Sequence, residues 1–352
     1  MIPSQVIVVG SRVRVSSHGA GMVAMDNEDG TWNINFDDDG EGNFKESDLA
    51  LLLDQSLEEL RLPAAPTSQE VPNGIRVIVG DPSKVPTPEG WTRFVCFSDT
   101  HGLHGSIPAA HMPSADVLLH GGDFTNTGEL DQIESFAAWL QAYPAKEKVV
   151  IAGNHETTFH EEFYTTGGGS RFHDPPLDWT RAKGLLTRNG CCTYLEDAST
   201  EALGYLVYGS PWQPAFCDWA FNLATESDLW RKWQEIPQDV DILLTHGPPR
   251  GYGDHTSQDR RMGCAELRDA IKARGVPVNV CGHIHAGYGW AADESTLYIN
   301  ASTCNSAYSP CNPPIVFDAP PAALLRSATC KRGGGTGGAR QEVAATSLDE
   351  WV

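Results

Sequence analysis

The chain has 352 residues, of which 40% are hydrophobic and ten are tryptophan, enough for one large α/β domain and a small additional module. Its 46 acidic and 25 basic residues give a formal net charge of −21 at pH 7. Because polyanions are bound through clustered Lys and Arg, this balance argues against duplex DNA, RNA and anionic membranes as partners. It does not exclude small phosphate esters, since a bound metal ion would dominate the local field.

The chain shows no recognisable signal for secretion or membrane insertion. The apolar run VIVV near the start is too short for a signal peptide and follows Pro3. No apolar stretch approaches the roughly 20 residues of a membrane-spanning helix. The nine cysteines are odd in number and two are adjacent, Cys191 and Cys192, which is a poor disulfide framework. These features favour reduced thiols and a cytoplasmic location.

Residues 1–55 are expected to form a small acidic β module. The stretches VIVVGSRVRVSS and TWNINFDDDG show the alternation and β-branched content of strands, and Gly, Asp and Asn form the turns between them. The pattern resembles an SH3- or Tudor-like barrel. Such a module is either a solvated appendage that aids solubility or a surface that binds a protein partner.

The stretch RLPAAPTSQEVPNG is rich in Pro, Ser and Ala, and residues 56–90 are interpreted as a linker with one leading strand, IRVIVG. The main domain is expected over residues 91–321, followed by a flexible Gly-rich tail over residues 322–352.

Three helical patterns lie between apolar runs of the main domain. ELDQIESFAAWLQAY has its apolar residues on one stripe, SDLWRKWQEI begins at the N-cap candidate Ser227, and CAELRDAIKARG ends at the C-cap candidate Gly275. Strands that alternate with helices predict a sheet buried beneath helices.

Five short apolar runs each end in residues that bind divalent metal ions. In chain order the runs are VCFSDTHG, VLLHGGDF, VVIAGNHE, ILLTHGPP and VNVCGHIHAGYG. The polar residues at their ends are Asp99, His101, Asp123, Asn154, His155, His246, His283 and His285. One apolar run that ends in histidine is usually an ordinary strand, but five in one chain indicate a shared metal site.

The spacing of these residues fits strand geometry. Side chains two residues apart lie on the same face of a strand, so Asp99 and His101 can reach one point, as can His283 and His285. Ligands of open α/β sheets collect at the carboxyl ends of the strands. Glycines stand beside the predicted ligands, where the backbone has to turn tightly or approach closely.

Without His155, the set comprises two Asp, one Asn and four His. These oxygen and nitrogen donors suit Mn, Fe, Zn or Co better than Ca or a Cys-bound Zn. Two divalent ions, two carboxylates and a bridging hydroxide leave about one positive charge, which favours a phosphate ester as the target. His155 would help the leaving oxygen depart as a general acid or electrostatic stabiliser.

The remaining histidines lack partner motifs and are expected at the surface or in packing. His120 is the exception, because it stands three residues before Asp123 and can contact a ligand from behind.

The order D-x-H, GGD, GNHE, THGPP, GHIH resembles that of the calcineurin-like metallophosphoesterase superfamily over about residues 92–318. The stretches GSPWQPAFCDWAFN, THGPPRGYGD, GHIHAGYG and YINASTC are similar to the metallophosphoesterase-domain (MPPED, 239FB-like) subfamily, which is related to class III cyclic nucleotide phosphodiesterases. The resemblance implies two packed β-sheets flanked by helices, a four-layer αββα sandwich, with a binuclear metal centre.

By the same resemblance, one metal ion would be bound by Asp99, His101, Asp123 and His285. Asp123 would bridge to the second ion, completed by Asn154, His246 and His283. His155 would be the catalytic histidine. Some animal relatives carry Gly in place of His283, which weakens catalysis, whereas this chain retains the histidine.

We therefore expect a binuclear-metal-dependent phosphodiesterase that hydrolyses small phosphodiesters such as cyclic nucleotides, with Mn supporting activity in vitro. Trp212 and Tyr288 are candidates to stack on a base, and the aromatic cluster of Trp212, Phe216, Trp219 and Phe221 can line the pocket or simply pack in the core. The alternatives are a phosphomonoesterase or protein phosphatase, a nucleotide-binding regulator with weak activity, and a scaffold whose working part is the N-terminal module.

Overall fold

The computed structural model describes residues 67–258 and 260–330, together with five strands between Arg12 and Leu51. The chain divides into two compact units, a small N-terminal one and a larger one, which are described separately.

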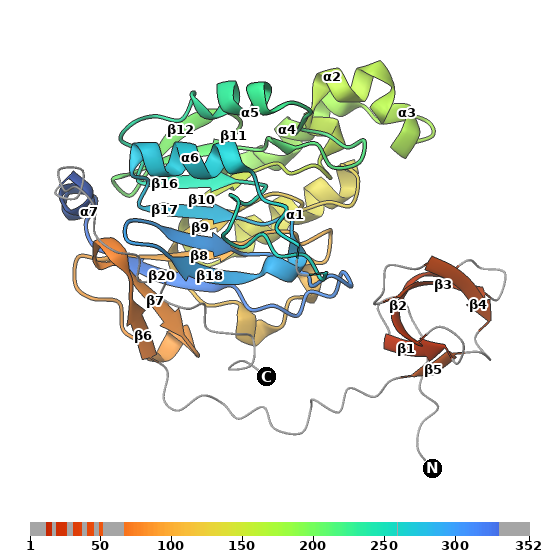
Figure 1. Ribbon diagram of the computed structural model, residues 1–352, viewed down its shortest axis with the longest axis horizontal. Coiled ribbons are helices and arrows are strands. Elements are labelled where there is room, and N and C mark those ends of the chain that lie inside the picture. Colours follow the sequence, from red (N-terminus) through yellow and green to blue (C-terminus); the bar gives the residue numbers. More distant parts are fainter. Residues whose placement is uncertain are drawn as a thin grey trace, which may run out of the picture. The chain divides into compact units, whose positions relative to one another are not determined.

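The N-terminal unit contains a five-stranded antiparallel sheet in the order β4-β3-β2-β1-β5 (Figure 1). Its strands are β1 (Arg12–Val15), β2 (Gly19–Asp26), β3 (Thr31–Phe36), β4 (Glu41–Lys45) and β5 (Leu49–Leu51). The predicted SH3- or Tudor-like barrel stays a prediction, because the side chains and turns of this unit lie outside the described residues.

The larger unit contains a seven-stranded sheet in the order β11-β10-β9-β8-β20-β7-β6. Its strands are β6 (Thr67–Glu70), β7 (Arg76–Val79), β8 (Thr92–Phe97), β9 (Ala115–His120), β10 (Ala145–Ile151), β11 (Thr193–Leu195) and β20 (Ile315–Ala319). Strands β8 to β11 run parallel, and β20 pairs antiparallel with both β8 and β7.

A six-stranded sheet has the order β12-β13-β16-β17-β19-β18. Its strands are β12 (Ala198–Ala202), β13 (Tyr205–Ser210), β16 (Ile242–Thr245), β17 (Val278–Cys281), β18 (Gly289–Ala292) and β19 (Leu297–Asn300). The four inner strands are parallel and the two edge strands antiparallel. A separate short pair joins β14 (Gln213–Pro214) to β15 (Asn222–Leu223).

The α-helices are α1 (Leu130–Ala142), α2 (Glu161–Phe163), α3 (Gly169–Phe172), α4 (Ala182–Leu186), α5 (Glu226–Trp233), α6 (Ala265–Arg274) and α7 (Ala322–Cys330). A π-helical turn covers Tyr164–Gly168. Short 3₁₀ turns cover Pro72–Gly74, Pro82–Lys84, His104–Ser106, Ala109–His111, Thr157–Phe159, Trp179–Arg181, Arg188–Gly190 and His285–Gly287. Among the described residues, no helix has the length and apolar character needed to cross a bilayer.

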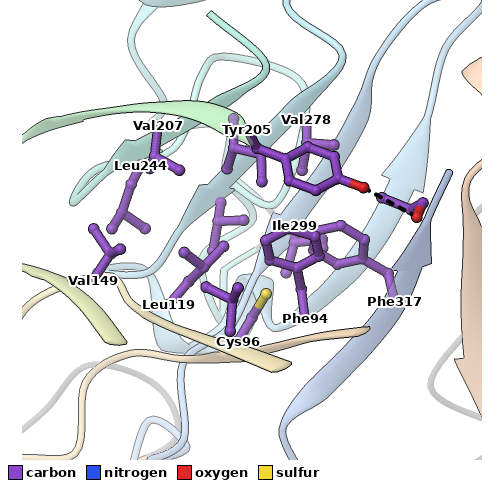
Figure 2. Packing of buried hydrophobic residues seen from close by; sticks show 14 of the residues in the cluster. Phe94, Cys96, Leu119, Val149, Tyr205, Val207, Leu244, Val278, Ile299 and Phe317 are labelled. Atoms are coloured by element: carbon purple, nitrogen blue, oxygen red, sulfur yellow. Dashed lines mark hydrogen bonds between the residues drawn. The ribbon is translucent and has the colours of Figure 1, made fainter. Parts of the chain in front are cut away.

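The main core lies between the two sheets, because alternate residues of each strand face the partner sheet. Figure 2 shows Phe94, Cys96 and Leu119 of the seven-stranded sheet in one cluster with Val207 and Leu244 of the six-stranded sheet. The alternate residues of the same strands pack outward, against α1 and α4 on one side and against α5 and α6 on the other. The predicted four-layer αββα sandwich is therefore confirmed.

Two of the three helical patterns are confirmed in full, and one needs a correction. Helix α1 buries the predicted stripe, and α6 ends before Gly275, whose φ is 62°. The N-cap of α5 is Thr225 rather than Ser227, since the Thr225 hydroxyl accepts a hydrogen bond from the backbone N–H of Asp228 at 3.1 Å.

The main domain extends beyond both of its predicted boundaries, residues 91 and 321. Residues Thr67–Glu70, interpreted as linker, form β6 because they pair antiparallel with β7. Residues Ala322–Cys330, assigned to the tail, form α7, in which Leu325 is fully buried and Arg326 pairs with the buried Asp241. Residues 331–352, the rest of the predicted tail, lie outside the described residues.

Candidate metal centre

The polar residues that follow strands β8, β9, β10, β16 and β17 converge in space. Within the described residues, three groups of side chains have potential metal-binding atoms that all lie within 4.8 Å of one another. The groups are Asp99, His101 and His285; His101, Asp123 and His155; and Asp123, His246 and His283. Because His101 and Asp123 each belong to two groups, the three form one cluster. The remaining predicted ligand, Asn154, has its Oδ1 atom 3.0 Å from His246 Nε2.

The backbone is strained where several of these residues leave their strands. The φ angles of Asp99, His101, Asp123 and His283 are 51°, 42°, 53° and 66°. A left-handed conformation costs about 1–3 kcal/mol for a residue with a β carbon and is concentrated at functional sites. The strand ends support one another here, since the His101 N–H donates to the Asp123 carbonyl at 2.9 Å. The strain is thus built into the loops that direct these side chains into the cluster.

Glycine is required at two positions where side chains of the cluster lie close to the backbone. A β carbon on Gly153 would collide with the Asp123 carboxylate and the His246 ring, and a β carbon on Gly282 would collide with Asp99. The predicted role of these glycines beside the ligands is therefore steric room for the cluster.

The hydrogen bonds of His285 leave its Nε2 atom facing other acceptors. Its Nδ1 lies 2.9 Å from the Asn305 carbonyl oxygen and must carry the proton that is donated there. In the neutral ring Nε2 is then an acceptor, yet it lies 3.2 Å from His101 Nε2 and 3.5 Å from Asp99 Oδ1. A cation between these atoms satisfies all of them.

His246 is held in the same way. Its Nδ1 lies 2.8 Å from the Gly121 carbonyl oxygen, so Nε2 faces Asp123 Oδ2 at 3.2 Å and Asn154 Oδ1 at 3.0 Å. The buried Gln213 donates from Nε2 to Asn154 Oδ1 at 3.2 Å, which turns the amide oxygen toward His246. The donor chemistry at both histidines fits a bound metal ion.

The pKa values follow from burial and from the neighbouring charges. Burial and the adjacent histidines lower the pKa of His101 and of His283 to about 3, so both are neutral near pH 7, the form that binds metal ions. At His246 burial opposes protonation, but Asp123 and Asp99 raise the pKa to about 9. Against the effect of burial, His246 and His155 hold the pKa of Asp123 well below its usual range. The cluster therefore attracts positive charge.

His155 lies at the cluster, and contacts hold both its backbone and its ring. Its backbone N–H donates to Asp123 Oδ1 at 2.9 Å, and its Nδ1 is hydrogen-bonded to the Asn126 carbonyl. The Nε2 atom lies 4.0 Å from Asp123 Oδ2. The ring stacks on Trp219 with centroids 4.3 Å apart and an interplanar angle of 27°. This arrangement directs Nε2 toward the cluster.

Glu156 is a site residue that the sequence analysis missed. It is fully buried and accepts hydrogen bonds from the backbone N–H groups of Asp123 and Gly153, at 2.8 and 2.7 Å, through Oε2. Its Oε1 accepts from the N–H and the hydroxyl of Thr125, at 2.9 and 2.8 Å. Burial and the charge of Asp123 raise the pKa of Glu156 to about 8, and the hydrogen bonds from Gly153 and Thr125 oppose that rise. The sequence contained one signal for this role, because Glu156 is the last residue of the GNHE motif.

His120 supports the cluster from behind. It is fully buried, its Nδ1 accepts from the Gly122 N–H at 3.3 Å, and its Nε2 lies 3.3 Å from the Thr100 hydroxyl. The contact helps to hold the turn that precedes Asp123.

The two residues predicted to stack on substrate have other partners. Trp212 contacts His160 and Phe221 and donates from Nε1 to Asp197 at 2.9 Å. Tyr288 packs against the core between the sheets and donates to the Pro313 carbonyl at 2.7 Å. These contacts are with residues outside the cluster, whereas Trp219 and Phe216 of the same predicted aromatic group touch His155 and His283.

The chain is similar to several known proteins. The family model described as calcineurin-like phosphoesterase matches residues 92–287. The chain is 43% identical over 258 residues to Metallophosphoesterase domain-containing protein 1 of Homo sapiens and to that of Mus musculus, which covers 71% of this chain and 77% of each relative. It is 40% identical over 242 residues to UPF0046 protein T07D4.2 of Caenorhabditis elegans, covering 65% of this chain and 60% of the relative. A solved structure, TT1561 of Thermus thermophilus, matches with a TM-score of 0.41 and 14% identity over 60% of this chain and 88% of that one.

Proposed function

Because the chain belongs to the calcineurin-like phosphoesterase family, whose members use divalent metal ions to hydrolyse phosphoric esters, we propose that it is a binuclear-metal-dependent phosphodiesterase acting on small phosphodiesters. The observation that carries the proposal is the cluster of three overlapping ligand groups at the carboxyl ends of parallel strands from both sheets.

The overlap of the groups supports a division of the ligands between two ions. His101 and Asp123 each belong to two groups, and Asp123, the carboxylate of the two, is the candidate bridge. One ion would be held by Asp99, His101, Asp123 and His285, and the other by Asp123, Asn154, His246 and His283. When bound, the two ions supply Lewis acidity and an activated water.

The charge of the site suits an anionic ester of phosphoric acid and does not by itself choose between a diester and a monoester. The three groups contain two carboxylates, Asp99 and Asp123, so two divalent ions and one hydroxide leave a charge of about +1. A diester carries one negative charge and a phosphomonoester about two near neutral pH. A phosphomonoesterase or protein phosphatase is the second candidate, since the ligand set itself suits both.

His155 is the proposed proton donor at the scissile ester. Its Nδ1 keeps a proton for the Asn126 carbonyl, so a proton that arrives at Nε2 can be passed to the leaving oxygen. The side chain is 14% exposed, which lets a substrate reach it.

Cyclic nucleotides are the proposed substrates, Mn²⁺ the proposed metal for activity in vitro, and the cytoplasm the proposed location. Cys96, Cys191 and Cys264 are buried thiols without a disulfide, which is consistent with a reducing compartment.

A protein partner for the N-terminal β module is a further part of the proposal, testable by pull-down with residues 1–60.

The test is hydrolysis of bis(p-nitrophenyl) phosphate, p-nitrophenyl phosphate, and 3′,5′- and 2′,3′-cyclic AMP and GMP by the full chain, with metal analysis of the same sample. We expect turnover of the diesters with Mn²⁺ and its loss with chelator. Metal-independent turnover would reject the metal centre, faster hydrolysis of the monoester would favour the second candidate, and tight AMP binding with negligible turnover would favour a regulator.

The variant His155→Ala separates chemistry from metal binding. We expect a loss of about 10²–10⁴-fold in kcat, the usual contribution of a general acid, with metal content unchanged. The matched control Trp230→Ala alters a 57% exposed aromatic residue on α5 and is expected to keep full activity.

A further inference from the structure

The loop between β14 and β15, residues 215–221, carries two aromatic residues that pack on two different members of the metal-ligand cluster. Trp219 stacks on His155, as described above. Phe216 meets His283 edge to face, with ring centroids 5.6 Å apart and an interplanar angle of 80°. One ring thus lies beside the proposed proton donor and the other beside a proposed metal ligand.

The two aromatic residues differ in exposure. Trp219 is partly buried and also contacts Phe172 at a centroid distance of 4.5 Å, so its ring is used to hold His155. Phe216 is 54% exposed. A single exposed apolar residue needs no explanation by itself, but this one lies against a residue of the cluster. Its free face is therefore available to a molecule bound there.

The loop that carries Phe216 is fixed at its base. Asn222 donates from Nδ2 to the carbonyl oxygens of Phe216 and Cys217, both at 3.1 Å. Backbone hydrogen bonds close the loop from Gln213 N–H to the Phe221 carbonyl and from Ala215 N–H to the Leu223 carbonyl. These contacts hold the position of the Phe216 backbone before any ligand binds.

Gln213 connects this loop to the cluster. Its Nε2 atom lies 3.4 Å from Asn222 Oδ1 and 3.2 Å from Asn154 Oδ1. At the other end of the loop, Phe221 has a φ of 55°, an unfavourable value for a bulky residue, and its N–H donates to His160 Nδ1 at 2.9 Å. A strained, anchored loop beside a reaction centre is typical of a preorganised binding surface.

We propose that Phe216 forms the stacking surface for a flat aromatic group of the ester, and so makes this site selective for phosphoesters that carry a nucleobase or an aryl group. The inference rests on the proposed function, because it takes the phosphorus to lie at the metal-ligand cluster. Base-aromatic stacking contributes about 1–3 kcal/mol, which corresponds to about 5- to 150-fold in affinity.

The test compares ligands with and without the ring, using calorimetry on the full chain loaded with Mn²⁺. The probes are AMP against ribose 5-phosphate, and phenyl phosphate against methyl phosphate, so that the two pairs distinguish a nucleobase from an aryl group. For Phe216→Ala we expect a loss of about tenfold in affinity for at least one ring-bearing probe, and a change below about twofold for its ring-free counterpart. Phe216→Trp should retain the preference, and the control Trp230→Ala should leave all four affinities unchanged.

Kinetics supply a second readout. With bis(p-nitrophenyl) phosphate, Phe216→Ala should raise KM about tenfold and leave kcat within about twofold, because the ring binds substrate without taking part in the chemistry. If Phe216→Ala lowers the melting temperature, Phe216→Leu keeps the apolar bulk without the aromatic face and serves in its place.

The inference is overturned if Phe216→Ala weakens both members of each pair equally, if it changes neither, or if the metal-loaded wild-type chain binds no ring-bearing probe. Failure of the proposed function has a different signature. In that case the ring-dependent affinity survives while no ester is turned over.

Discussion

The seven-stranded sheet brings the candidate oxygen ligands Asp99, Asp123 and Asn154 to the metal centre, whereas the six-stranded sheet brings only histidines, His246, His283 and His285. Two of the three ligand groups contain residues from both sheets. The third, His101, Asp123 and His155, comes from the loops of the seven-stranded sheet alone. Two of the ligand groups are therefore complete only when the two sheets pack together.

Each sheet also orients the side chains of the other. The His283 N–H donates to both oxygens of the Asp99 carboxylate, at 2.9 and 3.0 Å. His246 Nδ1 lies 2.8 Å from the carbonyl of Gly121, in the loop after β9. The comparison teaches that both carboxylates come from one sheet and three of the four ligand histidines from the other, and that each sheet donates or accepts hydrogen bonds that orient the ligands of its partner.

The largest effect is expected at Asp123, the carboxylate that is shared between two ligand groups. Asp123→Asn removes a carboxylate charge and the candidate bridge, so we expect less than half of the wild-type metal content and a loss of at least about 10³-fold in diesterase activity. Elemental analysis and a diester assay check both. Full metal content in this variant would contradict the bridging role.

A smaller effect is expected when a ligand that follows the six-stranded sheet is removed. His246→Ala removes one ligand that belongs to a single group, so one of the two ions should be retained while activity falls by about 10²-fold. Metal titration of the two variants side by side sharpens the comparison. Equal metal loss from both would show that the sheets do not divide the ligands as proposed.

The variant Glu156→Gln tests whether Glu156 holds the metal ligands that follow the strands of the seven-stranded sheet. The amide cannot accept hydrogen bonds at both ends, so buried N–H groups of Asp123, Gly153 or Thr125 lose their partner. We expect metal affinity to weaken about 10- to 100-fold, as for other outer contacts of metal sites. Glu134→Gln, at an exposed residue of α1, is the matched control, and an equal effect in both variants would remove the special role of Glu156.

The smallest effect is expected far from the cluster. Thr225→Ala removes the N-cap of α5, on the outer face of the six-stranded sheet, and should cost about 1 kcal/mol of unfolding free energy. Chemical denaturation measures the loss. Metal content and kcat should stay unchanged, and a fall in either would mean that this outer layer is coupled to the site.

The strand ends and two of the helical patterns were predictable because their signals are local. Apolar runs that close with Asp or His place those residues at strand ends whatever the partner strands are, as with Asp99, Asp123 and His246. Helix α7 was missed because its stability depends on Leu325 reaching the core and on Arg326 reaching Asp241, two contacts that are distant in sequence. The N-cap of α5 was missed because Thr225 and Ser227 are both suitable N-cap residues and only the backbone geometry selects one.

The sequence by itself determined the family, the fold class and the residue types that meet at the centre, because these follow from short motifs and from the period of apolar residues along strands. Only the tertiary structure decided that Glu156 accepts four hydrogen bonds behind Asp123, and that the rings of Trp219 and Phe216 pack on His155 and His283. Such choices depend on which face of a loop is covered by another element. That information arises when the two sheets and their loops pack together, and no local pattern contains it.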